Sequence, residues 1–222
     1  MIIFENVSKE YRIKRFRKPV FNNLNFVIRR GESIGICGAN GAGKSTLMRL
    51  LAGVDSPTSG RITRTMSTSW PLGYGAAFQH SLTGADNARF IARIYNRDED
   101  QLLEQVESFA ELGPYLYQPL STYSSGMSGR FAFALSLTID FECFLIDEMI
   151  SAGDARFRKR SEAALMERRE RSSLVMISHE PAALQRYCDR AAVLYGGSLT
   201  FFDSVSEACE VHYSLQALSG PR

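Results

Sequence analysis

Short apolar runs separated by turns and helical stretches recur along this chain of 222 residues. Residues 33–37 (Ser-Ile-Gly-Ile-Cys) and 143–146 (Cys-Phe-Leu-Ile) are nearly continuous apolar runs, which predicts buried strands. Strand-like runs follow at 173–177, 191–195 and 199–202, and residues 61–65 are a further strand candidate. Buried strands that alternate with helical segments are typical of an α/β fold with a largely parallel sheet.

The first thirty residues predict a strand pair of another kind. Residues 2–7 and 24–30 are interpreted as antiparallel neighbours at the edge of the fold. Between them lies a basic stretch made of Arg12, Lys14, Arg15, Arg17 and Lys18, ending at Pro19. The simplest interpretation of this stretch is a solvated hairpin loop. Contact with anionic lipid headgroups or with a membrane partner is the alternative.

Residues 83–137 differ from the rest because their pattern is mostly helical, with interruptions at Gly113–Pro114 and Pro119. The acids at 98–100 suit a helix start, where the helix dipole favours negative charge. The block separates two groups of predicted strands. We therefore interpret it as a helical subdomain inserted into a single domain of residues 1–222.

Composition excludes several classes of function. A net charge of +2 gives no electrostatic footprint for nucleic acid, so no nucleic-acid partner is predicted. No segment approaches the about 18 apolar residues that a membrane-spanning helix requires. The N-terminus does not resemble a signal peptide. The four cysteines lie far apart and form no CxxC pair: Cys37, Cys143, Cys188 and Cys209. Of these, Cys37 and Cys143 lie in apolar runs and are expected to be small buried side chains in a reducing compartment. We expect a cytoplasmic protein that another protein can hold at a membrane.

One stretch carries a specific chemical signal. The residues concerned are Gly38, Ala39, Asn40, Gly41, Ala42, Gly43, Lys44, Ser45 and Thr46, which fit the phosphate-loop pattern. In such a loop, backbone N–H groups surround phosphate oxygens at a helix N-terminus. Lys44 would lie between the β- and γ-phosphates and Ser45 would bind Mg²⁺. An incidental Gly-rich turn is the alternative, but the predicted strand before it and helix after it favour a nucleoside triphosphate site.

The apolar run at 141–146 ends in two carboxylates, Asp147 and Glu148. Open parallel sheets bind ligands at the carboxyl ends of their strands. Asp147 is a candidate for holding Mg²⁺, directly or through water. Glu148 is a candidate for polarising the water that attacks the γ-phosphate. Alone, this pattern is as often the end of a structural strand. Downstream of a phosphate loop it indicates a site of ATP hydrolysis.

A segment reading Tyr-Ser-Ser-Gly-Met from residue 123 precedes this strand, and with it the chain resembles the ATP-binding subunits of ABC transporters. Those proteins carry a phosphate loop, a Gln loop, an LSGGQ-type signature, a strand ending in Asp-Glu, an Asp-containing loop and a lone His. The corresponding features follow in the same order here: Gly38–Thr46, Gln79, Tyr123–Met127, Asp147–Glu148, Asp154 and His179. The resemblance covers essentially the whole chain. It implies a P-loop NTPase (RecA-like) core, an antiparallel β subdomain and an inserted helical subdomain.

The resemblance also implies a role for the signature. Its members are Ser124, Ser125, Gly126 and Met127. Ser124 and Gly126 would contact the γ-phosphate of a nucleotide bound to the other protomer. The segment departs from the family pattern at Tyr123 for the usual Leu, at Ser125 for the first Gly and at Met127 for Gln. The hydroxyl and the small residue needed for close approach remain.

Four further residues receive roles from the resemblance. Gln79 would be the coupling glutamine and a Mg²⁺ ligand, although it precedes Leu82 more closely than in many family members. His179 would hold the γ-phosphate and the attacking water, whereas a lone His is more often structural. Asp154 would lie in the Asp-containing loop by the nucleotide. Tyr11 would stack on adenine, with a half-buried strand aromatic as the alternative.

Residues 69–75 and the Phe-x-x-x-Leu-Thr-Gly segment at 78–84 resemble the ATPases of bacterial polysaccharide exporters. That segment occurs in subunits that export capsule, O-antigen or teichoic acid. The chain ends without an appended carbohydrate-recognition domain, which favours the capsule type with a separate membrane permease. The implied protein is a head-to-tail homodimer that hydrolyses ATP with Mg²⁺. It would be a peripheral protein on the cytoplasmic face of the bacterial inner membrane and need not contact its polysaccharide cargo.

Two other classes remain as alternatives. A soluble ABC-type ATPase without a transport function usually carries two such domains or a long coiled coil, and neither pattern occurs in this sequence. A phosphate-loop kinase for a small metabolite would need an acceptor pocket. The segment from residue 123 argues against a kinase because it predicts a site completed by a second protomer.

Overall fold

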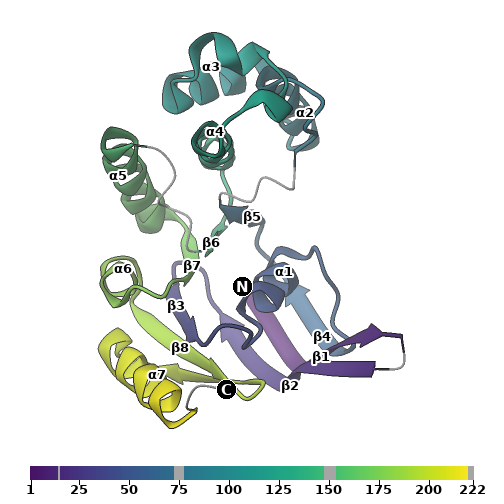
Figure 1. The fold of residues 1–222 in the computed structure, drawn as a ribbon, viewed down its shortest axis with the longest axis vertical. Helices are drawn as coiled ribbons and strands as arrows, with labels where there is room; N and C mark the ends of the chain where they lie inside the picture. The colour runs from purple at the N-terminus through teal and green to yellow at the C-terminus, as the bar shows by residue number, and fades with distance from the viewer. Residues whose placement is uncertain (15, 73–77, 148–153, 220–222) are drawn as a thin grey trace. The chain divides into compact units, whose positions relative to one another are not determined.

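The computed structural model describes residues 1–14, 16–72, 78–147 and 154–219. The chain divides into two compact units, and each is described by itself (Figure 1). The first unit contains Met1–Ser69, Phe141–Glu148 and Arg168–Arg222. The second contains Trp70–Asp140 and Met149–Glu167.

A six-stranded sheet forms the centre of the fold. Its strands follow the order β5 (Thr68–Leu72), β6 (Cys143–Asp147), β7 (Ser173–Ile177), β3 (Ser33–Gly38), β8 (Arg190–Tyr195) and β9 (Ser198–Phe202). The four strands from β6 to β8 are parallel, and β9 is antiparallel to β8. Every residue of β3 and β7 is buried, as expected where both faces of a parallel sheet are covered. The predicted α/β fold is confirmed. β5 was not predicted, because Pro71 argues against a strand in sequence.

A second, antiparallel sheet has the order β2 (Phe16–Ile28), β1 (Ile2–Ile13) and β4 (Ser59–Arg64). The predicted antiparallel pairing of the two strands is confirmed, since Ile2 lies opposite Ile28, but the prediction that the basic stretch between them is a loop was wrong. Arg12 pairs with Arg17 and Tyr11 with Lys18, so these residues lie within a long hairpin. The two arginines flank the carboxylate of Glu10, at 3.2 and 3.6 Å, which offsets their repulsion. Register shifts between Phe4 and Glu10 interrupt the alternation that would have revealed the longer strand.

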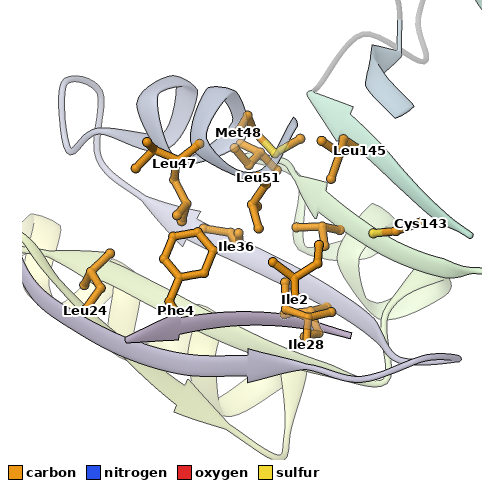
Figure 2. Packing of buried hydrophobic residues seen from close by; sticks show 14 of the residues in the cluster. Ile2, Phe4, Leu24, Ile28, Ile36, Leu47, Met48, Leu51, Cys143 and Leu145 are labelled. Atoms are coloured by element: carbon orange, nitrogen blue, oxygen red, sulfur yellow. The ribbon is translucent and has the colours of Figure 1, made fainter. Parts of the chain in front are cut away.

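The first unit has its hydrophobic core around helix α1 (Lys44–Ala52) (Figure 2). The core residues labelled there are Ile2, Phe4, Leu24 and Ile28 of the antiparallel sheet, Leu47, Met48 and Leu51 of α1, and Ile36, Cys143 and Leu145 of the parallel sheet. Burying each Leu or Ile contributes about 1.5–3 kcal/mol. The helix that follows the phosphate loop is thereby fixed to both sheets.

Two further helices, α6 (Pro181–Tyr187) and α7 (Val205–Ser219), pack against the parallel sheet. The sulfur of Cys37 in β3 lies 4.0 Å from that of Cys209 in α7. All four cysteines are buried free thiols, which confirms the burial predicted for Cys37 and Cys143. Burial raises the pKa of both Cys37 and Cys143 to about 12, so these thiols stay protonated at neutral pH.

The second unit is helical. It contains α2 (Gly84–Ile94), α3 (Glu99–Ala110), α4 (Ser125–Thr138), the 3-10 turns η2 (Gly113–Tyr117) and η3 (Leu120–Thr122), and most of α5 (Ala155–Arg171). Asp98 caps α3 by accepting a hydrogen bond from the amide of Gln101, which confirms the predicted helix start. Phe157 of α5 packs its ring against Phe109 of α3 and Phe133 of α4. The predicted helical range, 83–137, therefore holds α2 to α4, while α5 joins from later in the chain.

Candidate functional site

A pocket of about 340 Å³ lies in the first unit at the phosphate loop. Its lining residues are Tyr11, Lys18 and Val20 of the hairpin, Asn40, Gly41, Gly43, Lys44, Ser45 and Thr46 of the loop and α1, and Asp147 and His179. Tyr11, six of the nine residues predicted for the phosphate loop, Asp147 and His179 therefore lie around one cavity.

The order of the parallel strands brings these residues together. β6, β7 and β3 are adjacent, and Asp147 at the end of β6 is opposite Ile177 at the end of β7. Ile36 of β3 is opposite the same Ile177. The carboxyl ends of the three strands therefore lie along one edge, the usual ligand-binding edge of such sheets. His179 follows β7 directly and lies at that edge as well.

The loop conformation depends on its glycines. Gly41 and Gly43 have φ of 80° and 109°, a region that other residues rarely adopt. A Cβ on Gly43 would lie 2.6 Å from Cγ1 of Val20, so the hairpin also packs too closely for a side chain there. Gly43 is the N-cap of α1, and the first turn of that helix carries no acidic residue. The helix dipole at this end is therefore available to an anion.

Lys44 is held over the loop that precedes it. Its ammonium donates hydrogen bonds to the carbonyl oxygens of Gly38 at 2.7 Å and Ala39 at 3.1 Å. A phosphate oxygen carries more negative charge than a carbonyl oxygen and forms the stronger hydrogen bond with an ammonium. The arrangement suits a lysine that exchanges loop carbonyls for phosphate.

The pocket offers oxygen donors suited to Mg²⁺. These are the hydroxyl of Ser45 and the carboxylate of Asp147, both at the lining of the cavity. Mg²⁺ usually binds one or two protein oxygens together with phosphates and water rather than a cage of protein ligands. The donor set thus fits a magnesium nucleotide.

Lys18 and Val20 line the pocket although sequence reasoning assigned them no role in the site. Lys18 lies opposite Tyr11 in the hairpin register, so the two side chains reach the same end of the cavity. Recognising the long hairpin would have revealed Lys18. Val20 carried no signal, because an apolar strand residue is ordinary.

Gln79 belongs to the second unit, in the segment that precedes α2. Asn87 of α2 holds its backbone, accepting from the Gln79 amide at 2.9 Å and donating to the Gln79 carbonyl at 3.0 Å. The side-chain amide of Asn87 also donates a hydrogen bond to the carbonyl of Thr83 at 2.8 Å. Only 3% of Asn87 is exposed. Sequence reasoning missed Asn87, and a polar residue one turn after the N-cap Thr83 was the available signal.

The signature segment forms the N-terminus of α4. The hydroxyl of Ser124 accepts a hydrogen bond from the amide of Met127 at 3.2 Å and so caps the helix. The space beside Gly126 is open, since a Cβ there would meet no atom nearer than 4.0 Å. Tyr123, in place of the usual Leu, donates its hydroxyl to the carbonyl of Tyr115 and packs against Phe131. Burial raises the pKa of Tyr123 to about 12, so it remains a neutral anchor for this helix start.

Two predicted site residues lie around the gap between β6 and α5. Glu148 lies outside the described residues, so its role stays a prediction. Asp154 accepts a hydrogen bond from the amide of Phe157 at 2.8 Å, which begins α5. That bond lowers the pKa of the Asp154 carboxyl, and the nearby Arg130 and Arg156 lower it further. Asp154 thus has a capping role within the chain.

Residues 21–151, more than half of the chain, match the family model described as ABC transporter. The chain belongs to the ABC transporter family. It is 50% identical over 215 residues to the capsule polysaccharide export ATP-binding protein CtrD of Neisseria meningitidis serogroup B, covering 97% of this chain and all of that protein. It is 49% identical over 216 residues to the ATP-binding protein BexA of Haemophilus influenzae, with the same coverage of both chains.

The fold is also that of solved ABC cassettes. The dimeric post-hydrolysis structure of the ATP-binding cassette MJ0796 bound to ADP and Pi superposes with a TM-score of 0.77 at 21% identity. The match covers 90% of this chain and 96% of that one. The predicted P-loop NTPase fold of the ABC type is confirmed. Among the described residues, no helix is both long and apolar enough to cross a membrane.

Proposed function

We propose that this chain is the ATP-hydrolysing subunit that energises export of a polysaccharide, most specifically capsular polysaccharide, with a separate membrane permease. The observation that carries the proposal is the pocket that phosphate-loop residues line together with Asp147 and His179. Support for the cargo comes from the relative named for capsule polysaccharide export. The match covers 97% of this chain and the entire length of that relative.

The residues of the pocket, together with Glu148 and Gln79, would divide the work of hydrolysis. Loop amides and the N-terminus of α1 bind the phosphates, and Lys44 neutralises charge on the β- and γ-phosphates. Tyr11 provides a face for the base. His179 orients the γ-phosphate and the attacking water, while Glu148 accepts the proton of that water. Gln79 adds a contact that responds to the permease.

Ser45 and Asp147 are the residues that would hold Mg²⁺, with Gln79 as the further candidate. The ion supplies Lewis-acid stabilisation of the charge that develops on the phosphate oxygens. The residues around it fix the donors in place, since Asp147 ends a buried strand and Ser45 lies in the first turn of α1.

A second copy of the chain completes each site in this proposal. The N-terminus of α4, with Ser124, Ser125, Gly126 and Met127, would bind the γ-phosphate held by the partner's phosphate loop. The open space beside Gly126 supports close approach of a ligand. A hydroxyl and a helix N-terminus also suit an anion. The dimer would close on ATP and open after hydrolysis.

The permease would dock on the second unit. That unit exposes several large apolar side chains on and around α2 and η2: Leu82, Phe90, Ile94, Tyr115 and Tyr117, with exposed fractions of 43–59%. Exposed aromatic and apolar groups at this density favour a protein interface. Through the permease the chain would lie peripherally on the cytoplasmic face of the inner membrane, where it need not contact the polysaccharide.

The test is a Lys44→Ala variant examined both in isolation and in a capsulated bacterium that lacks its own subunit. We expect loss of ATP hydrolysis by the purified protein, because the phosphates lose their assigned cation, and loss of surface capsule in the cell. Co-purification of an integral membrane protein in detergent is expected for wild type and variant alike. Near-normal hydrolysis in the variant would refute the site assignment. Normal capsule with an inactive ATPase would refute the proposed cargo.

A further inference from the structure

A polar cluster connects the hairpin to the turn that follows α1. Lys9 and Tyr11 of β1, Arg49 of α1, and Asp55 and Ser56 of the turn form it. These segments are far apart in sequence and belong to the same compact unit. None of the roles proposed above uses Lys9, Arg49, Asp55 or Ser56.

Asp55 is held firmly on one side. Its Oδ1 accepts from the ammonium of Lys9 at 2.6 Å and from the amide of Ser56 at 2.8 Å. The Lys9 ammonium also donates to the carbonyl of Ser56 at 2.7 Å, and only 9% of the Lys9 side chain is exposed. Burial alone would raise the pKa of the Asp55 carboxyl, but hydrogen bonds from Lys9, Tyr11 and Ser56 lower it overall. The carboxylate is therefore ionised and fixed at neutral pH.

The other oxygen of Asp55 fixes Tyr11. The tyrosine hydroxyl donates to Oδ2 at 2.8 Å and accepts from Nη2 of Arg49 at 2.9 Å. A phenol has one proton to donate, so the Tyr11 hydroxyl gives its proton to the hydrogen bond with Asp55 and accepts the one from Arg49. Nη2 of Arg49 also approaches Oγ1 of Thr46 at 3.3 Å, which connects the cluster to the phosphate loop.

The ring fixed in this way is part of the nucleotide pocket. Tyr11 lines the cavity together with Lys18 and Val20, whereas Lys9, Arg49 and Asp55 do not line it. Lys9 and Arg49 approach the same ring to 4.9 and 5.9 Å from its centroid. The cluster therefore holds the tyrosine from outside the pocket and leaves its lining surface to a ligand.

We propose that Asp55 is a positioning residue for the nucleobase, holding the Tyr11 ring in the orientation on which the base stacks. This inference rests on the proposed function, since it requires a nucleotide in the pocket. Stacking depends on ring orientation, so a ring free to turn about its bonds loses part of its contact with the base. Phosphate binding depends on the loop and α1, which the core holds independently of Asp55.

Paired titrations of the full-length protein test this separation. The Mg²⁺ salts of ADP and of pyrophosphate, which has no base, are titrated calorimetrically into wild type and Asp55→Asn. The amide keeps the shape of the carboxylate but removes its charge. We expect ADP affinity to fall about 3- to 10-fold, the effect of losing one hydrogen bond. Pyrophosphate affinity should be unchanged. An equal loss for both ligands overturns the proposal, because it would mean that Asp55 supports the loop.

Tyr11→Phe supplies a second, independent variant, because it keeps the ring and removes only the hydroxyl. We expect the same selective loss of ADP affinity. Adding Asp55→Asn to Tyr11→Phe should cause no further loss, since the two changes break one connection. Additive losses overturn the proposal. If Asp55→Asn does not fold, an unchanged ADP to pyrophosphate affinity ratio in Tyr11→Phe overturns it alone.

Asp203→Asn is the matched control, because Asp203 is an exposed carboxylate of the same unit. It should bind both ligands like wild type. Wild-type protein that binds neither ADP nor pyrophosphate would refute the proposed function as well. Wild-type binding with Asp55→Asn unchanged for ADP would refute only the role of Asp55.

Discussion

Single residues of the pocket carry separate electrostatic tasks. Lys44 holds its charge against loop carbonyls, and Asp147 ends a buried strand with a carboxylate at the same cavity. His179 lies at the end of the neighbouring strand. Binding and bond breaking can therefore be altered one residue at a time.

The Glu148→Gln variant separates nucleotide binding from bond breaking most directly. The amide keeps the shape of the carboxylate but cannot accept the proton of the attacking water. Losing a general base lowers rates by about 10²–10⁴. We expect hydrolysis to fall by that order while ATP affinity is retained, with a long-lived ATP-bound dimer in size-exclusion chromatography. Wild-type hydrolysis would show that Glu148 is not the catalytic carboxylate, and weak ATP binding would show that binding and chemistry are not separable here.

At the scale of elements, one side chain fixes the segment that carries Gln79. Asn87 of α2 makes three hydrogen bonds to the backbone of Gln79 and Thr83 from a buried position. Residues 78–83, the described part of this segment, form only an isolated bridge between Thr83 and Pro119 before α2 begins at Gly84. Its conformation therefore depends on this amide.

Asn87→Ala should lower the free energy of unfolding by about 1–3 kcal/mol, because buried backbone groups lose their partners. Urea denaturation monitored by circular dichroism measures the change. Gln101→Ala, an exposed amide in the same unit, is the control and should stay within about 0.5 kcal/mol of wild type. A loss no larger than that of the control would contradict the anchoring role of Asn87.

Helix α7 brings a titratable group close to the pocket. His212 is only 8% exposed, and its pKa is lowered first by burial and then by electrostatic interaction with Lys44 and His179. Between this lowered pKa and the ordinary value of about 6.5, the unfolded chain binds more protons than the folded protein. Stability therefore falls as pH drops below about 6.5.

His212→Gln should remove part of that loss. Urea midpoints at several pH values between pH 8 and pH 5 would show a shallower acid slope in the variant than in wild type. His80→Gln, which changes an exposed histidine, is the control and should keep the wild-type slope. An identical slope in the His212 variant would mean that other groups cause the acid sensitivity.

At the scale of the whole molecule, the proposed site belongs to two chains. Each chain carries a phosphate loop at the N-terminus of α1 and a signature at the N-terminus of α4. If these ends meet across a dimer, defects in different halves should complement one another.

Lys44→Ala and Ser124→Arg, each inactive alone, should therefore recover part of the ATPase rate when mixed. One of the two sites in a mixed dimer keeps both its own loop and its partner's signature. A chain carrying both changes is the control, since it cannot restore a site with either single variant. No recovery, with mixed dimers demonstrated, would argue against the head-to-tail arrangement.

Local sequence determined those parts of the protein that depend on neighbours in the chain. The spacing of Gly38, Gly43 and Lys44 predicted a phosphate loop that ends at a helix N-terminus. The structure contains this loop, with Gly43 at positive φ as the N-cap of α1. Continuous apolar runs specified the buried strands, and Asp98 specified the start of α3. Backbone conformation and burial periodicity act over a few residues, so such features can be predicted from a short window.

Only the tertiary structure decided which distant residues meet. Strand order places Asp147 and His179 beside the phosphate loop, and no local pattern encodes which parallel strands become neighbours. The long hairpin was missed because register shifts break the alternation of apolar and polar residues along it. The place of Lys18 in the pocket was missed for the same reason. Sequence reasoning assigned Asp55 no role in the site, because only the fold brings it to Tyr11. Side-chain networks of this kind form through contacts between segments that the core, rather than the sequence around them, holds together.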